Sequence, residues 1–371
     1  MLVMFRDAFR NKTVWLSGDT GFKGSWLAHW LLLMGARVQG FALPPATNPA
    51  LFEQLGLATR LEHMDGDIRD AALVRKSIEA AQPDFVFHLA AQALVRLSYD
   101  QPLETYATNV MGTAHVLEGM RQLKRPCAAV IVTTDKCYEN REWLHGYREE
   151  DPLGGHDPYS SSKAAAEIVT SAYRRSFYGG HPVRIATARA GNVIGGGDWA
   201  LDRIVPDCMR ALQKGEAIPV RNKTATRPWQ HVLEPLSGYL WLAAMLANPE
   251  FGKFDLAQFT PAFNFGPGPE SNRTVAELVG EVLKHWPGRW EDKSDPKAVH
   301  EAKLLQLATD KAYSLLGWLP SWRFADAIAQ TTQWYREALM DSGPKQVQEV
   351  TSRQIQEYFD AAKRQNIAWA V

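Results

Sequence analysis

The chain has 371 residues, 46% of them hydrophobic, and its 41 Lys and Arg residues balance 41 Asp and Glu residues. A chain of this length and composition can bury a large core, which excludes a disordered tail and a small disulfide-stapled domain. Because the net charge is zero, no overall field attracts nucleic acid, and we expect no nucleic-acid partner.

The first half of the chain alternates short apolar runs with segments of helical length, a pattern typical of a parallel sheet with helices on both faces. Strands are predicted at residues 13–17, 37–42, 84–88, 128–133 and 183–188. Helices are predicted to begin near Phe22, Asp70, Pro102 and Pro158. Proline suits a first helical turn because its missing N–H costs nothing there. The pattern predicts an α/β fold with a Rossmann-type, doubly wound parallel sheet.

The second half of the chain is less regular, and Pro and Trp become frequent after Asp198. Helices are predicted near Thr274, Asp310, Phe324 and Ser352, between short irregular stretches. This favours a smaller, mixed α/β second domain. We therefore predict domains over residues 1–192 and 193–371, with residues 235–260 returning to the first domain. The apolar run at 263–265 is a second segment that is a candidate to return to the first domain.

A glycine-rich loop, SGDTGFKGSWL, follows the first predicted strand, with Gly18, Gly21 and Gly24 spaced three apart. Glycines at a strand-to-helix junction let the backbone approach a pyrophosphate, whose charge then lies at the helix N-terminus. The same pattern occurs in ordinary turns, but its position here predicts a dinucleotide-binding site.

The residue that commonly holds the adenosine ribose is missing. It is expected about 20 residues beyond the glycines, where this chain reads FALPP at residues 41–45, with neither a carboxylate nor an arginine. These residues therefore do not decide whether the cofactor is NAD or NADP. Asp67 and Ile68 are candidates to bracket the adenine; alternatively, they belong to the N-cap region of the helix that begins near Asp70.

Tyr159 and Lys163 stand four residues apart at the start of a predicted helix, which places both on one face. A phenol has an ordinary pKa of about 10, and a neighbouring ammonium favours the phenolate that can accept a hydroxyl proton during hydride transfer. The alternative is a Tyr and a Lys on the exposed face of an amphipathic helix.

Thr134, Asp135 and Lys136 follow the strand predicted at 128–133, at the carboxyl end where open α/β sheets bind ligands. A threonine hydroxyl there can hydrogen-bond a sugar oxygen, Asp135 is a candidate general acid and Lys136 a candidate base. The alternative is a solvated Asp–Lys pair at a strand end.

Together these motifs resemble the extended short-chain dehydrogenase/reductase superfamily and, within it, the nucleotide-sugar dehydratases. The segments that carry the resemblance are SGDTGFKGSWL, DIRD, HLAAQ, TTDKCYEN, YSSSK, RAGNVIGGGDWALDRIVPD and RPWQHVLEPLSGYL. They are most similar to the CDP-glucose 4,6-dehydratase family, since the dTDP-glucose relatives carry Asp-Glu in place of Asp135-Lys136. Two positions depart from the family: Ser17 replaces a frequent Thr, and Asp19 replaces a frequent His. A carboxylate beside a pyrophosphate is mildly unfavourable.

The resemblance implies a redox-neutral step of deoxysugar biosynthesis on CDP-glucose, with NAD as a bound catalyst. Carbon 4 is oxidised, water is eliminated across carbons 5 and 6, and the hydride returns to carbon 6. Tyr159 would take the carbon-4 hydroxyl proton, assisted by Lys163 and Thr134. Asp135 would protonate the leaving hydroxyl, and Lys136 would remove the carbon-5 proton.

The resemblance also implies binding residues and an assembly. Residues 1–192 would bind NAD through Gly18, Thr20, Gly21, Phe22, Lys23, Gly24, Asp67, Ile68, Ala90, Tyr159 and Lys163. Residues 193–371 would bind the nucleotide sugar, and the candidate substrate contacts are Arg96, Asn192, Arg203 and Arg227. Helices at 102–124 and 158–178 resemble those that form the family's dimer interface, which implies a homodimer or homotetramer.

Cysteine usage and hydropathy bear on the compartment. Cys127, Cys137 and Cys208 form no CxxC pair and are odd in number, which predicts reduced thiols and neither a disulfide nor a metal site. No run approaches the roughly 18 uncharged apolar residues that a membrane span needs. We expect a cytoplasmic protein with no membrane partner.

Two other functions are compatible with parts of the pattern. A nucleotide-sugar epimerase, or a dehydratase for another nucleotide, would share the cofactor loop, but an epimerase has no need of Asp135-Lys136. A non-catalytic NAD sensor would have no use for Tyr159, Lys163 and Thr134 together.

Overall fold

The computed structural model describes residues 3–251, 261–294, 304–340 and 343–371. The strands are β1 (Thr13–Ser17), β2 (Arg37–Ala42), β3 (Glu62–Asp65), β4 (Phe85–His88), β5 (Cys127–Val132), β6 (Val183–Arg189), β7 (Val193–Ile194), β8 (Ile218–Val220), β9 (Thr226–Pro228), β10 (Gln230–His231), β11 (Ala262–Asn264), β12 (Asn272–Thr274) and β13 (Trp290–Asp292). The helices are α1 (Phe22–Leu33), α2 (Leu51–Gln54), α3 (Ala71–Ala81), α4 (Val95–Asp100), α5 (Pro102–Tyr106), α6 (Gly112–Met120), α7 (Pro158–Phe177), α8 (Ile204–Gln213), α9 (Leu233–Ala247), α10 (Val275–His285), α11 (Asp310–Leu316), α12 (Phe324–Met340) and α13 (Pro344–Arg364).

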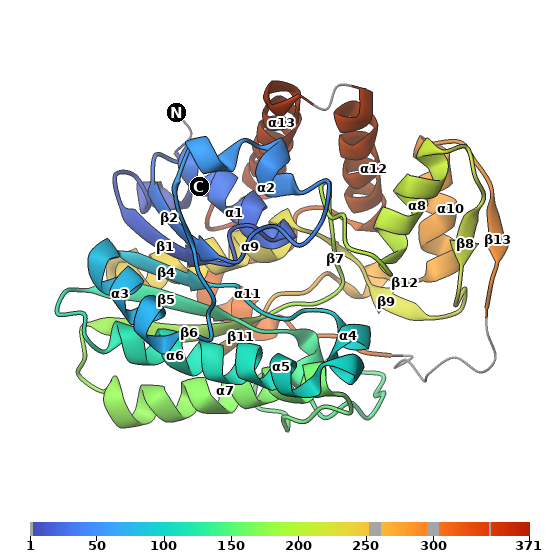
Figure 1. Cartoon of the computed structure of the whole chain (residues 1–371). Coiled ribbons are helices and arrows are strands. Elements are labelled where there is room, and N and C mark those ends of the chain that lie inside the picture. The colour runs from blue at the N-terminus through green and yellow to red at the C-terminus, as the bar shows by residue number, and fades with distance from the viewer. Residues whose placement is uncertain (1–2, 252–260, 295–303, 341–342) are drawn as a thin grey trace.

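A parallel sheet of seven strands forms the centre of the molecule (Figure 1). Its order is β11-β6-β5-β4-β1-β2-β3, and every neighbouring pair is parallel. The order reverses between β1 and β4, so ligands are expected beyond the carboxyl ends of these strands. The predicted Rossmann-type fold is confirmed.

Two strands of this sheet, β3 and β11, were not predicted as strands from the sequence. β3 reads EHMD and is mostly exposed, so it has no apolar run that would mark it. β11, which covers part of the apolar run at 263–265, pairs with β6 at the opposite edge. The second half of the chain therefore contributes to the first sheet.

Helices cover both faces of the sheet: α1 and α9 lie on one face, and α3, α6 and α7 lie on the other (Figure 1). α1 is buried from Gly24 to Leu31, and α9 from Leu233 to Leu246. A helix that is apolar on all sides belongs in the interior, which is why α9, distant in sequence, fills the space beside α1. Of the predicted return segment, residues 252–260 lie outside the described residues.

α7 has signals at both ends that explain its length. Pro158 occupies the first turn, the Asp157 side chain accepts a hydrogen bond from the Ser160 N–H, and Arg174 and Arg175 lie in the last turn.

The helix predicted at 102–124 is wrong in its extent. It consists of α5, a π-helical turn at Ala107–Met111 and α6, which ends at Met120, shortly before Pro126.

α13 packs against α1 and α2, and α11 packs against α9 and β11. The other elements gather beyond the carboxyl ends of the strands, around α8, α10 and α12 (Figure 1). They include the two-stranded pairs β10–β7, β12–β9 and β13–β8. The helices predicted near Thr274, Asp310 and Phe324 are α10, α11 and α12, whereas the helix predicted near Ser352 begins earlier, at Pro344. The division at residue 192 stays a prediction. No helix within the described ranges has the length and apolarity needed to cross a bilayer.

Candidate active site

Close backbone contacts shape the loop after β1. Gly18 has a φ of +78°, and a Cβ there would lie 2.7 Å from the nitrogen of Ala90. A Cβ on Gly24 would lie 2.0 Å from the Gly18 carbonyl oxygen. Gly21 is the N-cap of α1, so the unpaired N–H groups of the first helical turn border this loop. Such a cradle of glycines and a helix N-terminus fits a pyrophosphate.

Ser17 connects the strands beneath this loop. Its hydroxyl lies 2.7 Å from His88 Nδ1 and accepts hydrogen bonds from the Leu89 and Ala90 N–H groups, both at 3.2 Å. His88 is buried, and burial lowers the pKa of its imidazole to about 3. The hydroxyl that the family's Thr would supply is thus retained by Ser17, and it joins β1 to β4.

The Asp19 side chain lies against β2 and β3. Its Oδ2 lies 2.7 Å from His63 Nδ1, and a Cβ on Gly40 would lie 2.1 Å from the same oxygen. Burial raises the pKa of Asp19, and the neighbouring His63 lowers it. His63 therefore offers a partner for the carboxylate that departs from the family. Sequence reasoning missed His63 because β3 itself carries no strand signal.

The other predicted cofactor residues lie around the same loop. Thr20 donates a 2.9 Å hydrogen bond to the Leu43 carbonyl at the end of β2. Ile68 is buried, and its side chain packs against Gly112 of α6. Asp67 accepts hydrogen bonds from Arg69, whereas Asp70 caps α3 by accepting from the N–H groups of Ala72 and Leu73. The cap is therefore Asp70, and adenine contacts for Asp67 and Ile68 stay a prediction.

Phe22 and Lys23 begin α1 and point toward the second half of the chain. A Cβ on Gly195 would lie 3.1 Å from the Phe22 ring. The Lys23 ammonium lies 5.9 Å from the ring centre of Tyr239 in α9. Burial, together with the charge of Arg203, lowers the pKa of Lys23 to about 7.

Thr134, Asp135 and Lys136 form a polar cluster directly beyond β5. The Thr134 hydroxyl donates to Asp135 Oδ1 at 3.0 Å, and Asn192 Nδ2 donates to Asp135 Oδ2 at 2.9 Å. The Lys136 ammonium lies 3.6 Å from Asp135 Oδ1; the Asp135 side chain is 2% exposed and that of Lys136 33%. The prediction missed Gly191, where a Cβ would lie 2.0 Å from the Asp135 carboxyl carbon.

Tyr159 and Lys163 reach this cluster from the first turns of α7. Burial raises the pKa of Tyr159 to about 12, although a hydrogen bond with Thr134 and the charge of Arg203 oppose this rise. Lys163 Nζ donates to the Val132 carbonyl at 2.9 Å. Burial lowers the pKa of Lys163 to about 8. α7 thus places a phenol beside Thr134 and an ammonium against the end of β5.

The predicted arginines lie in three different places: Arg203 precedes α8 as its N-cap, Arg96 is on α4 and Arg227 is on β9. Arg203 lies 2.7 Å from Asp198, and its charge reaches Tyr159, so it belongs to the cluster. Arg96, on α4, is 3.5 Å from Asp202. Arg227 is half-buried on β9, donates to the Thr226 carbonyl and precedes the buried Trp229.

Tyr239 is a buried site residue that sequence reasoning missed. Its hydroxyl has no hydrogen-bond partner among the described residues. It interacts electrostatically with Tyr159 and Asp135. No local pattern singled it out, because only the packing of α9 against the sheet brings it here.

Comparisons with known proteins agree with this geometry. The family model described as GDP-mannose 4,6 dehydratase matches residues 16–331. A CDP-glucose 4,6-dehydratase from Salmonella typhimurium is 45% identical, over 97% of this chain and 99% of its own length. A dTDP-glucose 4,6-dehydratase from Streptomyces antibioticus is 30% identical, over 87% of this chain and 92% of its own.

A solved structure agrees as well. The dTDP-glucose 4,6-dehydratase DesIV from Streptomyces venezuelae, with NAD and TYD bound, is 26% identical with a TM-score of 0.73, over 87% of this chain and 97% of its own. The fold, the family model and the identity over nearly the whole chain lead to one conclusion. This chain belongs to the family of nucleotide-sugar 4,6-dehydratases that the GDP-mannose 4,6 dehydratase model describes.

Proposed function

We propose that this chain is a CDP-glucose 4,6-dehydratase, a hydro-lyase that converts CDP-D-glucose to CDP-4-keto-6-deoxy-D-glucose. The observation that carries the proposal is the convergence of Tyr159, Thr134 and Asp135 at the carboxyl end of β5. Oxidation of carbon 4 needs a base, and elimination needs an acid beside it. The Salmonella typhimurium relative supports CDP as the nucleotide, as does the Asp135-Lys136 pair.

NAD is the cofactor of this reaction, and the residues present fit it. The Gly18–Gly24 loop and the N-terminus of α1 would hold the pyrophosphate, with Ala90 beneath the loop. Thr20, Phe22 and Lys23 belong to that loop, and Asp67 and Ile68, beyond β3, are proposed to complete the site. The chemistry that bound NAD would supply is hydride transfer from carbon 4 and back to carbon 6.

The first chemical task of the chain is to remove the carbon-4 hydroxyl proton. Tyr159 is proposed as the base, and Thr134, which hydrogen-bonds to it, orients the phenol and the sugar oxygen. A buried phenol is a weak base until positive charge lies near it. Arg203 already supplies such charge, and Lys163, in the next turn of α7, is proposed to add more.

The second task is to eliminate water across carbons 5 and 6. Asp135 is proposed to protonate the leaving hydroxyl at carbon 6, held in place by Thr134 and Asn192. Lys136 is proposed to remove the carbon-5 proton, which the carbon-4 ketone acidifies. To do so, the Lys136 ammonium must first lose a proton and its ion pair with Asp135.

We expect Lys136→Ala to slow the exchange of the carbon-5 proton with solvent by about 100-fold, the usual range for loss of a general base. Deuterium uptake at carbon 5 in heavy water, followed by mass spectrometry, measures this. Lys345→Ala is the matched control, since that side chain is 92% exposed on α13. Exchange at the native rate in Lys136→Ala would remove Lys136 from this role.

Arginines are proposed to bind the diphosphate of the substrate. A guanidinium can grip two phosphate oxygens at once, and Arg203 lies at the catalytic cluster. Arg96 and Arg227 are proposed to extend this contact, and Asn192 to contact the sugar. Asp198 and Asp202, which pair with Arg203 and Arg96, would be displaced or would share these cations when the diphosphate binds.

We expect Gly24→Ala to weaken NAD binding by about tenfold or more, because the new Cβ would overlap the Gly18 carbonyl oxygen and displace the loop. Isothermal titration calorimetry measures the affinity. Gly280→Ala in α10 is the control, since a Cβ there meets nothing within 4 Å. Native affinity in Gly24→Ala would show that the loop tolerates the side chain.

The proposed function is tested by incubating the protein with NAD and CDP-glucose, dTDP-glucose or UDP-glucose in deuterated water. We expect loss of one water from CDP-glucose only, with deuterium at carbon 5 of the product. Loss of water from another nucleotide sugar would mean that the proposed substrate is wrong and that this other sugar is the substrate. No loss of water from any of them, with NAD bound, would favour an epimerase or a non-catalytic NAD sensor.

A homodimer or homotetramer in the cytoplasm completes the proposal. Exposed apolar side chains on α4, α5, α7 and the turn before α6 support a self-association face, since contiguous apolar surface is typical of interfaces. They are Tyr99, Leu103, Met111, Ile168 and Phe177. The buried free thiols of Cys127, Cys137 and Cys208 support a reducing compartment. Residues 1–192 are proposed as the NAD domain and 193–371 as the substrate domain.

A further inference from the structure

Glu167 and Arg189 form a buried ion pair that has no role in the chemistry proposed above. Arg189 Nη2 lies 3.0 Å from Glu167 Oε2, and each side chain is 4% exposed. Glu167 lies in α7, and Arg189 is the last residue of β6. Because desolvation offsets most of the attraction in a buried ion pair, stability alone gives little reason for one beside an active site.

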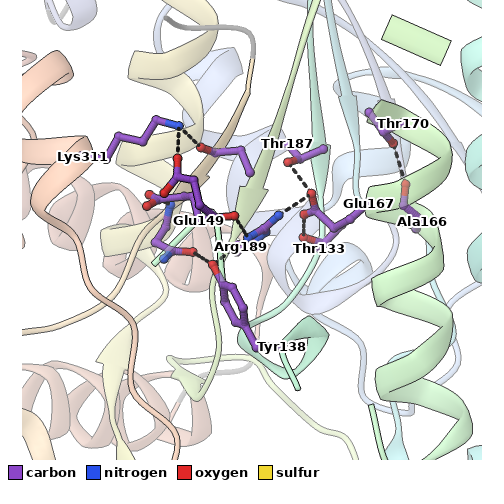
Figure 2. A network of polar contacts seen from close by, with 12 residues as sticks. Thr133, Tyr138, Glu149, Ala166, Glu167, Thr170, Thr187, Arg189 and Lys311 are labelled. Atoms are coloured by element: carbon purple, nitrogen blue, oxygen red, sulfur yellow. Dashed lines mark hydrogen bonds and ion pairs between the residues drawn. The ribbon is translucent and has the colours of Figure 1, made fainter. Parts of the chain in front are cut away.

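Both oxygens of the Glu167 carboxylate are hydrogen-bonded. The hydroxyl of Thr133 donates to one oxygen, and the hydroxyl of Thr187 donates to the other at 2.7 Å (Figure 2). Burial by itself raises the pKa of Glu167, but the charge of Arg189 and these hydrogen bonds together lower it below its ordinary value. The carboxylate is therefore charged at neutral pH, and both of its oxygens accept hydrogen bonds.

One end of the catalytic segment is attached to α7 through Glu167. Thr133 directly precedes Thr134, and the Lys163 ammonium donates to the carbonyl of Val132, one residue earlier. Glu167 follows Lys163 by one helical turn, so both side chains leave the same face of α7. Two consecutive residues at the end of β5 are thus fastened to the helix that carries Tyr159.

The other end of the segment is held by Arg189. Its Nη1 donates to the Tyr138 hydroxyl at 2.7 Å, and the guanidinium carbon lies 4.9 Å from the ring centre of Tyr138. The Tyr138 hydroxyl in turn donates to Asn264 of β11 at 2.8 Å. Figure 2 shows Arg189 between Glu167 and Tyr138. Thr134, Asp135 and Lys136 lie between Thr133 and Tyr138 in the chain.

We propose that the Glu167–Arg189 ion pair is a positioning device that holds both ends of the segment carrying Thr134, Asp135 and Lys136 and aligns it with Tyr159. This inference rests on the proposed function. The reason to hold the segment so firmly is geometric, since a misplacement of about 1 Å in a reacting group can cost about 100-fold in rate. Glu167 and Arg189 act through other residues and do not touch the substrate.

Glu167 also acts on the charge state of Lys163. The titratable groups that face Lys163 are Glu167 of α7, Cys137 beyond β5, Lys23 of α1 and His88 of β4. Burial lowers the pKa of Lys163, and the Glu167 carboxylate opposes this. Removing the carboxylate charge should therefore lower the pKa of Lys163 further, so that its ammonium is lost at a lower pH.

The test compares Thr133→Val with Thr187→Val. Each removes one buried hydroxyl from the same carboxylate, but only Thr133 adjoins the catalytic segment. We expect kcat to fall about tenfold or more in Thr133→Val with little change in KM, and to stay within about twofold in Thr187→Val. Thr133→Ser, which keeps the hydroxyl, should recover most of the loss. Equal kcat values in the two valine variants, at equal melting temperature, would overturn the inference.

A second pair of variants tests the other end and the charge. Tyr138→Phe removes the acceptor of Arg189 and should lower kcat while leaving KM nearly unchanged. Glu167→Gln should shift the alkaline limb of the kcat–pH profile to lower pH; an unshifted limb in a folded variant would contradict the charge effect. Circular dichroism checks folding, and the threonine pair remains informative if Glu167→Gln does not fold.

Failure of the inference and failure of the proposed function give different results. If the wild type converts CDP-glucose and the two valine variants match, only the positioning role fails. If the wild type converts no nucleotide sugar, the proposed function fails. NAD affinity, measured by quenching of tryptophan fluorescence, then still tests the inference. Lys163, a proposed NAD contact, is held by the carbonyl of Val132, the residue before Thr133. We therefore expect weaker NAD binding in Thr133→Val than in Thr187→Val, and equal binding would overturn the positioning role.

Discussion

Replacing Tyr159 with Phe should lower kcat for CDP-glucose by about 100-fold or more, the range expected when a general base is removed. The substitution removes only the phenol oxygen, which hydrogen-bonds to Thr134 and is proposed to take the carbon-4 proton. Because oxidation comes first, neither reduced nicotinamide nor product should accumulate. Rapid-mixing absorbance and product analysis measure both.

The control for this substitution is Tyr313→Phe, at a residue 57% exposed on α11. KM and NAD affinity in Tyr159→Phe should stay within about threefold of the wild type if the phenol acts mainly in the transition state. A kcat close to the wild-type value would assign the carbon-4 proton to another group. Tyr239→Phe would then be the next variant, because the Tyr239 hydroxyl is buried in the same site.

Asp135→Asn should separate the two halves of the reaction. The amide keeps the shape of the carboxyl group but cannot supply the proton for the leaving hydroxyl, so elimination should slow by about 100-fold or more. Oxidation at carbon 4, for which Tyr159 is the proposed base, should continue. We therefore expect reduced nicotinamide to accumulate on mixing with CDP-glucose while overall product formation nearly stops.

Asp360→Asn, on α13 away from the cluster, is the matched control and should behave like the wild type. Two results would contradict the role of Asp135. Product formation at the native rate would show that another group protonates the leaving hydroxyl. Loss of both reduced nicotinamide and product would mean that Asp135 serves the oxidation step instead, through Thr134.

Local patterns in the sequence were enough for much of the first half of the molecule. The strands at 13–17 and 37–42 have the predicted bounds, because each carries buried apolar side chains and is separated from its neighbours by turns. The loop with Gly18 and Gly24 was predicted from a spacing that its backbone contacts explain. In contrast, β3 was missed because an exposed edge strand needs no apolar pattern.

The candidate site divides in the same way. Tyr159 and Lys163 could be paired from sequence because helical periodicity places residues four apart on one face. Three other contacts could not be predicted from sequence: those of Asp19 with His63, of Asn192 with Asp135 and of Lys23 with Tyr239. Each joins segments far apart in the chain, and no local preference of either residue encodes the contact.

The sequence by itself therefore determined the class of fold, the glycine loop proposed for the cofactor and the residues proposed for the chemistry. The tertiary structure alone decided that β11 and α9 join the first sheet, and that Glu167 and Arg189 meet behind the catalytic segment. The physical reason is the range of the interactions. Turns, caps and periodicity act within a few residues, whereas these contacts depend on burying apolar and charged surface from the whole chain at once.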